Sequence, residues 1–443
     1  MSLKQKLGNY FQILPDDQVP PEVAQNFRHN FTVNLLDSSV WLFGDSFVSV
    51  STILPVFAAT LTDSPLVIGL IPALLNAGWF LPQVFTAGHV QRLPKLLPFT
   101  KRMAVMERIS YAFFPLLVLL LPVIPKSLAV WIFILLIAWR GVASGFVALP
   151  WQELIARVIP ISHRARFFGT SRVLGQTLGV VGSLIAAVVF GLVLYPFNYM
   201  ISFSLALVLT WISYFFFTMT KEPDRKQGGA QLQKEIGMEK DRLIDLPVFK
   251  QILKSDKNFV LYLVSRSLVF MGNMAAGFLA VYAIQRFVLS DDQAAIFTGL
   301  LFVSGVVGNA VWGSLGDKIG PKRVLFISGV IWSAAILLAI LSKTIWAYYG
   351  VFLLMGLSSS GSIMGDLMLV MELGDDARRP TYLGLARTLP GIFLLIAPML
   401  AGVIVKTSGY LVMFIVTLVF MGLGLAFLLP VKDRKRRRSQ QNS

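Results

Sequence analysis

The chain has 443 residues, of which 56% are hydrophobic and only 14% are charged, and its mean hydropathy is +0.71. Soluble domains carry roughly 25% charged residues, so this composition excludes a soluble domain and indicates a helical protein that crosses a membrane many times. The chain has no cysteine, which excludes disulfides, thiolate metal sites and cysteine nucleophiles. Its net charge of +16 would suggest nucleic-acid binding in a soluble protein, but the basic residues gather in alternate loops, so we expect no nucleic-acid partner.

Apolar runs of about 20 residues are long enough to cross a hydrocarbon core. Twelve such spans are predicted, at roughly 34–59, 66–88, 103–123, 128–150, 171–194, 199–219, 259–286, 293–315, 323–342, 345–370, 384–405 and 409–430. A polar stretch divides them into two groups of six. We therefore expect an N-terminal cytoplasmic segment at 1–33, an N-terminal six-helix bundle at 34–220, a cytoplasmic linker at 221–257, a C-terminal six-helix bundle at 258–430 and a basic cytoplasmic tail at 431–443.

The predicted linker has two interpretations. It contains Gly228-Gly229 and many charges, which favour a solvated connector. Its later part, Leu232 to Leu253, has apolar residues at partly helical spacing, so a helix on the membrane surface is the alternative.

Lysine and arginine alternate between rich and poor loops. The N-terminal segment, the loops after spans 2, 4, 8 and 10, and the tail from Lys432 to Arg438 are basic, whereas the opposite loops have few positive charges. The positive-inside rule then places both termini in the cytoplasm. We expect a multi-pass protein of the plasma (cell inner) membrane, with anionic lipid at the basic tail.

The two groups of spans can be aligned with each other. Asn30-Phe31 matches Asn258-Phe259, and Gly44-Asp45 falls on Gly272-Asn273 at the same offset. Later positions share a second offset, including Gly141 with Gly356, Gly169 with Gly384 and Arg172 with Arg387. Matches in the same order on both sides of a central linker predict a duplicated six-span unit.

Residues 312–325 form a tight charged turn between spans 8 and 9. Their order resembles the cytoplasmic loop motif of the major facilitator superfamily of transporters, at Gly313, Leu315, Asp317, Lys318, Gly320, Lys322 and Leu325, with Pro321 in place of a basic residue. The resemblance extends from about residue 30 to 430. It implies an all-α polytopic membrane protein with twelve transmembrane helices in two pseudo-symmetric six-helix bundles, and a substrate site near the midplane between them.

The resemblance also implies conformational gating by this loop. In the family the aspartate faces the start of a helix from the other half, where backbone N–H groups attract a carboxylate. Here Asp317 would meet the start of span 5, between Gly169 and Arg172. The first-half loop, Gly88 to Lys95, lacks the aspartate, and Arg387 would be its neighbour. The candidate gating residues are Gly313, Asp317, Gly320, Lys322, Arg172 and Arg387.

Charges inside spans are costly and usually face a cavity or a partner. Asp45 and Arg140 lie near the middle of spans 1 and 4, where they would pair either for proton coupling or substrate contact, or as a static lock. Asp37 lies on the same helical face as Asp45, with Trp41 between them, and we expect it to pair across the halves with Arg266; separate interfacial charges are the alternative. The candidates for substrate binding or proton coupling are Asp45, Asp37, Arg140, Arg266, Trp41 and Asn273.

Other polar or small residues in the spans have plainer interpretations. Glu107, Arg108, Asp366 and Glu372 lie near the cytoplasmic boundary and are interpreted as interfacial charges. Span 5 contains Gly175-x-x-x-Gly179-x-x-Gly182, which resembles the glycine-rich fifth-span motif of antiporters; close helix packing is the simpler interpretation.

The sequence has no nucleotide-binding loop, so ATP is not the expected energy source. We expect no enzyme and no cofactor, but a monomeric secondary active transporter that moves a small molecule by alternating access, coupled to protons or another ion, with export preferred. Uptake of a sugar or an organic anion is an alternative, because Arg140 and Arg266 would suit an anionic substrate. A non-transporting receptor or sensor on the same fold is the other alternative.

Overall fold

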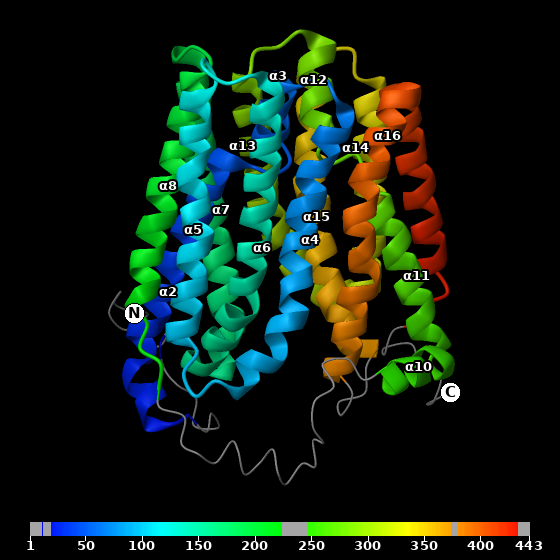
Figure 1. Cartoon of the computed structure of the whole chain (residues 1–443). Coiled ribbons are helices and arrows are strands. Elements are labelled where there is room, and N and C mark those ends of the chain that lie inside the picture. The colour runs from blue at the N-terminus through cyan, green and yellow to red at the C-terminus, as the bar shows by residue number, and fades with distance from the viewer. Residues whose placement is uncertain (1–10, 12–18, 224–245, 374–378, 433–443) are drawn as a thin grey trace, which may run out of the picture.

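The computed structural model describes residue 11 and residues 19–223, 246–373 and 379–432, all of them in helices or short connections (Figure 1). The first group of elements is α2 (Pro21–Asp45), η1 (Ser46–Val48), α3 (Ile53–Leu61), α4 (Pro65–Arg92), α5 (Leu97–Leu120), α6 (Lys126–Val158), α7 (Ile161–Leu192) and α8 (Phe197–Thr218). The second group is α10 (Leu246–Ser255), α11 (Lys257–Met271), α12 (Leu279–Phe287), α13 (Asp292–Ile319), α14 (Pro321–Leu341), α15 (Ile345–Leu373) and α16 (Arg379–Leu428).

The described residues contain ten helical stretches that are long and apolar enough to cross a membrane. One of them, Gly384–Leu428, has 45 residues and reverses at Gly409, whose φ of 83° is a conformation that only glycine adopts easily. It therefore crosses twice. The short helices α11 and α12 follow each other through a turn and make one further crossing. The twelve predicted spans are thus accounted for.

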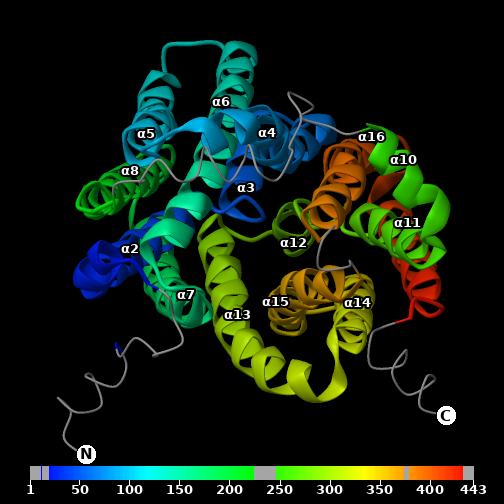
Figure 2. The same cartoon turned by 90° about the horizontal axis from the view of Figure 1, so that it is seen from below.

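The helices pack in two groups that lie side by side (Figure 2). In the first group α2 packs on α7 and α8, α4 packs on α6, and α5 packs on both α6 and α8. In the second group α11 packs on α16, and α15 packs on both α13 and α14. The groups meet along α7 with α13 and along α4 with α16.

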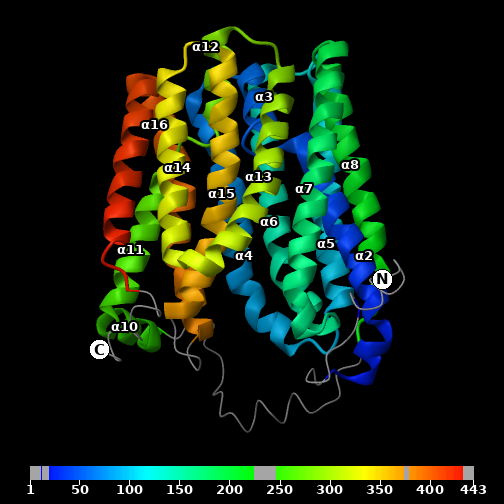
Figure 3. The same cartoon turned by 180° about the vertical axis from the view of Figure 1, so that it is seen from behind.

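The two ends of the molecule differ in how the groups meet. Figures 1 and 3 place α3 and α12 at one end, called here the α12 end, and α10 at the other, called the α10 end. At the α12 end Tyr199 of the first group donates a hydrogen bond to Asp291 of the second, at 2.9 Å, and the hydroxyls of Thr52 and Thr298 are 2.5 Å apart. Toward the α10 end Gly384 has no atom within 4 Å of its ideal Cβ position. The hydrogen bonds described between the ends of the two groups thus lie at the α12 end, and a further one joins Asn309 of α13 to Gln176 of α7.

Two asparagines tie the first and last spans of each group in the same way. The Asn30 side chain donates to the carbonyl of Lys221 and accepts from its N–H, both at 2.9 Å. The Asn258 side chain makes the same two bonds with Lys432, at 2.9 and 2.7 Å. These pairs, called here the asparagine clips, lie where the sequence repeat aligned Asn30 with Asn258, and they support the predicted duplication.

The loop between α4 and α5 is held by a residue that is distant in sequence. The Glu222 carboxylate accepts the N–H groups of Leu96 and Leu97, both at 2.8 Å, and pairs with Arg157 at 3.1 Å. Its side chain is only 2% exposed. A carboxylate is favourable at a helix N-terminus, so Glu222 stabilises the start of α5 in the half whose loop lacks the motif aspartate.

Two sequence expectations need correction or completion. The first helix begins at Pro21, well before residue 34, because proline suits the first helical turn and a helix can continue beyond the hydrocarbon. Part of the predicted linker, 224–245, and the tail 433–443 lie outside the described residues. Residues 246–255 form α10, which lies across the end of α11 in Figure 3, with Ile252 buried beside Phe259. This part fits the surface-helix alternative.

Candidate functional site

The first span of each group is interrupted at corresponding positions. α2 ends at Asp45 and the chain resumes a helix at Ile53, whereas α11 ends at Met271 and resumes at Leu279. The sequence repeat aligns Asp45, the last residue of α2, with Asn273, which lies inside the second break. Interrupted spans at corresponding positions of two halves are the best structural pointer to the substrate site of a secondary transporter.

Each break frees backbone carbonyls that need hydrogen-bond donors, because no water is available inside a membrane. Side chains from neighbouring helices bond them at 2.7–3.3 Å: Ser202 bonds Phe47, Arg140 bonds Val48, Trp332 bonds Gly272 and Tyr348 bonds Leu279. The breaks are therefore built into the packing of both groups.

Asp45 and Arg140 meet beside the first break, as the sequence led us to expect. Arg140 Nη2 lies 2.5 Å from Asp45 Oδ1, and the guanidinium lies 4.9 Å from the centroid of the Tyr111 ring. The Arg140 side chain is 5% exposed, whereas that of Asp45 is 22% exposed. The carboxylate is thus the more accessible member of the pair, and the guanidinium is buried.

A second charged cluster lies beside this pair in the first group. Arg108 Nη1 is 2.9 Å from Glu107 Oε2, and its Nη2 is 3.9 Å from Asp37 Oδ1. Ser213 donates to Asp37 at 2.6 Å, and Ser144 donates to Glu107 at 2.7 Å. The interpretation of Glu107 and Arg108 as interfacial charges is wrong: both are buried, because α6 and α8 supply polar partners at their depth.

The second group holds its own ion pair. Arg266 Nε is 2.7 Å from Asp366 Oδ1, which also accepts the Tyr262 hydroxyl at 2.5 Å. Arg266 lies 4.8 Å from the Phe270 ring centroid and is 6% exposed, whereas Asp366 is 30% exposed. Asp366 is therefore not a simple interfacial charge. The expected Asp37–Arg266 pair is not formed, because each residue has a partner on a neighbouring helix of its own group.

Two further candidates lie next to the breaks. Trp41 is partly exposed and lies one turn before Asp45 on the same face of α2. Asn273 is also partly exposed and donates its side-chain N–H to the carbonyl of Val269 at 2.9 Å. Both remain candidates for substrate contact.

The candidate gating residues lie in two places. Four are at or near the turn between α13 and α14, and the two arginines are on α7 and α16. Gly320 joins the helices with a φ of 85°, which requires glycine, and Lys322 donates to the carbonyl of Leu429 at 2.6 Å. Gly313 has no atom within 4 Å of its ideal Cβ position, and Arg172 and Arg387 are exposed. The side chain of Asp317 lies outside the described residues, so its contact with the start of α7 stays a prediction.

The glycines of α7 serve close packing. A Cβ atom built at Gly175 would lie 2.4 Å from Leu42 of the first span, and one built at Gly182 would lie close to Ser46, which follows α2. A Cβ atom built at Gly179 would lie 2.8 Å from Phe302 of α13. Beside them the Asn309 side chain donates to Gln176 at 2.8 Å, between the two groups. Sequence reasoning missed this pair, although two amides inside apolar spans were a signal for it.

Interrupted first spans and buried ion pairs beside them, in two similar groups of helices, are features typical of polytopic helical transport proteins of the membrane. Residues 262–443 match the sequence model of the Major Facilitator Superfamily. No curated protein matches the sequence. The second group of helices therefore matches this superfamily in sequence, and nearly the whole chain has the same fold as solved transporters.

The similar solved structures share the fold at low identity. A point mutant of the nucleoside transporter NupG is 15% identical, with 91% of this chain and 99% of that chain covered and a TM-score of 0.69. A D-xylose–proton symporter is also 15% identical, with 91% and 97% covered and a TM-score of 0.67. A bacterial homologue of the iron transporter ferroportin is 16% identical in its inward-facing state, with 90% and 97% covered and a TM-score of 0.60. Its outward-facing state is 15% identical, with 90% and 98% covered and a TM-score of 0.55.

Proposed function

We propose that this protein is a proton-coupled secondary transporter in which Asp45 carries the coupling proton. The observation that supports this role is the Asp45–Arg140 pair beside the first break, whose carboxylate is the partly exposed partner. Protonation of Asp45 would weaken the pair, while Arg140 would keep its bond to the Val48 carbonyl. A proton could therefore change the first span without unfolding the break.

The charge balance of the first group favours a bound proton. Asp37, Asp45 and Glu107 supply three carboxyl groups, whereas Arg108 and Arg140 supply two guanidiniums. With all five ionised, this cluster would carry one net negative charge inside the membrane, which is costly. One proton shared among the carboxyl groups removes that charge.

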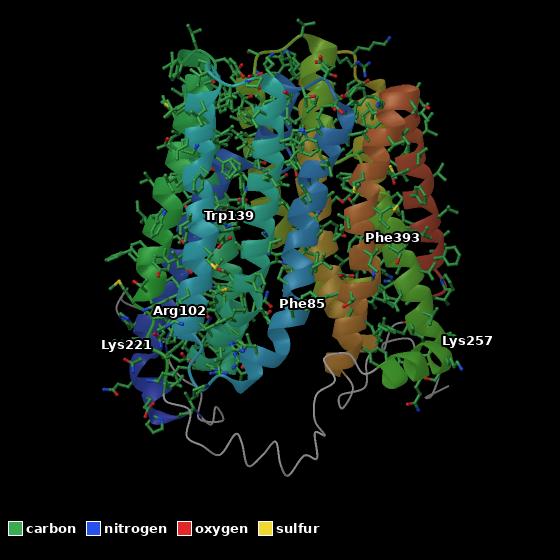
Figure 4. The ribbon with its side chains drawn as sticks, viewed as in Figure 1. Phe85, Arg102, Trp139, Lys221, Lys257 and Phe393 are labelled. Carbon is green, nitrogen blue, oxygen red and sulfur yellow. The ribbon has the colours of Figure 1, made fainter. Side chains whose placement is uncertain are left out.

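The α10 end is proposed to face the cytoplasm. Arg102, Lys221 and Lys257 lie in the half of the molecule near this end (Figure 4), in accord with the positive-inside rule. Because the Tyr199–Asp291 and Thr52–Thr298 contacts join the groups at the α12 end, the protein would then be inward-facing. The higher TM-score with the inward-facing state of the ferroportin homologue supports this assignment. Asp45 would release its proton to the cytoplasm, as proton-driven export across the plasma membrane requires.

The test is solute exchange in proteoliposomes, with and without a pH gradient. A panel of candidate solutes is first screened for counterflow by the wild-type protein. Asp45→Asn should abolish gradient-driven transport, whereas exchange without a gradient should survive at a reduced rate. Asp63→Asn, an exposed carboxylate in the loop before α4, is the matched control and should change neither. Driven transport that survives in Asp45→Asn would show that the proton binds elsewhere. A receptor or sensor would bind solutes without counterflow.

A further inference from the structure

We infer that the transported substrate is an organic cation, such as an amine or a quaternary ammonium compound, which is recognised by the carboxylates of Asp45 and Asp366. The inference rests on the proposed transport function and assigns the chemistry of its substrate. It replaces the expectation that Arg140 and Arg266 would recognise an anion.

The two ion pairs place their acidic and basic residues on opposite helices, but in both pairs the acidic residue is the more exposed partner. Each joins the first and fourth spans of its group. The carboxylate is on the first span in one group, where Asp45 pairs with α6, and on the fourth span in the other, where Asp366 pairs with α11. A duplicated unit would by itself give the same polarity twice. The exposed partner is nevertheless the carboxylate in both cases, at 22% and 30%, against 5% and 6% for the guanidiniums.

The guanidiniums are already occupied. Arg140 bonds a carboxylate and a backbone carbonyl and lies over the Tyr111 ring, and Arg266 pairs with a carboxylate and lies over a phenylalanine ring. Aromatic faces attract cations, so these rings hold the guanidiniums in their buried positions. An anionic substrate would have to displace these contacts before it reached a positive charge.

The carboxylates, in contrast, keep one oxygen available. The bonds described for Asp45 and Asp366 all end on Oδ1, and Oδ2 of each has no partner among the described residues. An exposed carboxylate inside a span must face a water-filled space, because a charge toward lipid is costly. Asp45 lies at the first break, and Asp366 lies closer to the α10 end of its helix. The two oxygens therefore lie at two different depths, one in each group of helices.

The free oxygens suit an organic cation better than a metal ion. Among the described residues, no group of three or more His, Cys, Asp and Glu could hold a metal ion, and a divalent cation needs several oxygen ligands. A bulky monovalent cation can interact with one oxygen at a time. Because a proton and an organic cation would compete for the same Asp45 carboxylate, each would leave as the other binds. Such competition is the condition for proton–substrate exchange, which favours export.

The test measures the sign of the electric potential at the site and requires no known substrate. The chain has no cysteine, so a single introduced thiol is the only reporter. Ser362→Cys lies one turn before Asp366, and Trp41→Cys lies one turn before Asp45. Each thiol is reacted with two methanethiosulfonate reagents of similar size, one bearing a trimethylammonium group and one a sulfonate.

The inference predicts that the cationic reagent reacts faster than the anionic one by roughly tenfold or more, relative to the ratio for a free thiol. Asp366→Asn should remove most of this preference at the reporter thiol of Ser362→Cys, whereas Glu153→Gln, an exposed carboxylate on α6, should leave it unchanged. Asp45→Asn should act in the same way on the reporter at position 41. A ratio near that of a free thiol, a preference for the sulfonate, or a preference that survives both Asp→Asn changes would overturn the inference.

These outcomes are separate from those that decide the proposed function. A cation preference in the labelling experiment without counterflow of any solute would contradict transport and support the charge assignment. Proton-driven exchange of neutral or anionic solutes, without a labelling preference for the cation, would contradict the charge assignment alone.

Discussion

Gly69 in α4 lies against Pro398 in α16, where the two groups of helices meet. In a Gly69→Ala variant the new Cβ would lie 2.2 Å from the Pro398 carbonyl oxygen and 3.1 Å from its carbon. Both are backbone atoms, so no side-chain rotation can relieve the overlap. Overpacking of this kind costs about 1–3 kcal/mol. If the groups separate at the α12 end, the cost disappears, and the ratio of open to closed molecules at that end should rise roughly 5- to 150-fold.

The separation can be followed by thiol labelling, since the chain contains no cysteine. Thr298 is buried against Thr52 at the α12 end, so a Thr298→Cys reporter should react slowly with a membrane-impermeant maleimide. Adding Gly69→Ala should raise the labelling rate by a factor similar to the shift in population. Gly402→Ala, whose Cβ would lie 2.8 Å from the carbonyl oxygen of Pro65, should act in the same direction but less.

Two control substitutions separate a change of conformation from a loss of stability. In Gly145→Ala the Cβ would lie 2.1 Å from the carbonyl oxygen of Gly78, inside the first group, so this variant should unfold at a lower temperature without faster labelling. Gly422→Ala has no neighbour within 4 Å and should change neither property. If Gly69→Ala labelled at the parental rate, or lost stability as Gly145→Ala does without faster labelling, the α4–α16 contact would not be part of a gate.

Three further predictions concern contacts outside the proposed transport site. Asn30→Ala removes two hydrogen bonds of about 0.5–1.5 kcal/mol each and should lower the unfolding temperature in detergent more than Asn26→Ala, which removes one; equal effects would contradict the clip. Glu222→Gln weakens a buried ion pair, which costs about 3 kcal/mol when it is broken outright, so an unchanged unfolding temperature would contradict its role at α5. Burial raises the pKa of Asp291, with a further contribution from Asp292 and an opposing one from the Tyr199 hydrogen bond. Closure at the α12 end should therefore be favoured below a pH of about 3.9, the ordinary pKa of aspartate, and should weaken as the pH rises through the raised pKa of Asp291. Spin-label distances across this end should lengthen with pH in the wild-type protein and stay constant in Asp291→Asn.

The sequence was sufficient for the spans and for one of the ion pairs. Hydropathy alone locates the spans, because only long apolar helices satisfy the backbone in lipid. Asp45 and Arg140 were expected to meet because a charge near the middle of a span needs a partner, and the repeat marked the position of the break. These inferences depend on local composition and on depth along the membrane.

The remaining charges could not be assigned from depth alone. Asp37 and Arg266 lie at corresponding depths, but depth does not reveal which helices are neighbours, and each pairs inside its own group. Glu107 looked interfacial because it lies near the end of an apolar run. Such a position has the same hydropathy whether the side chain faces water or, as here, a serine of the next helix.

The asparagine clips have a mechanical consequence for the ends of each group. Asn30 holds Lys221, where the first group leads into the connecting segment, and Asn258 lies where that segment enters the second group while it holds Lys432 before the C-terminal tail. A force applied to the connecting segment or to the tail would therefore act first on the paired hydrogen bonds of these asparagines, before α8 or α16 separates from its neighbouring helices. The asparagine clips thus keep such a force from reaching the helices. A reporter domain inserted between residues 224 and 245, or fused after residue 443, should therefore leave both groups of helices folded.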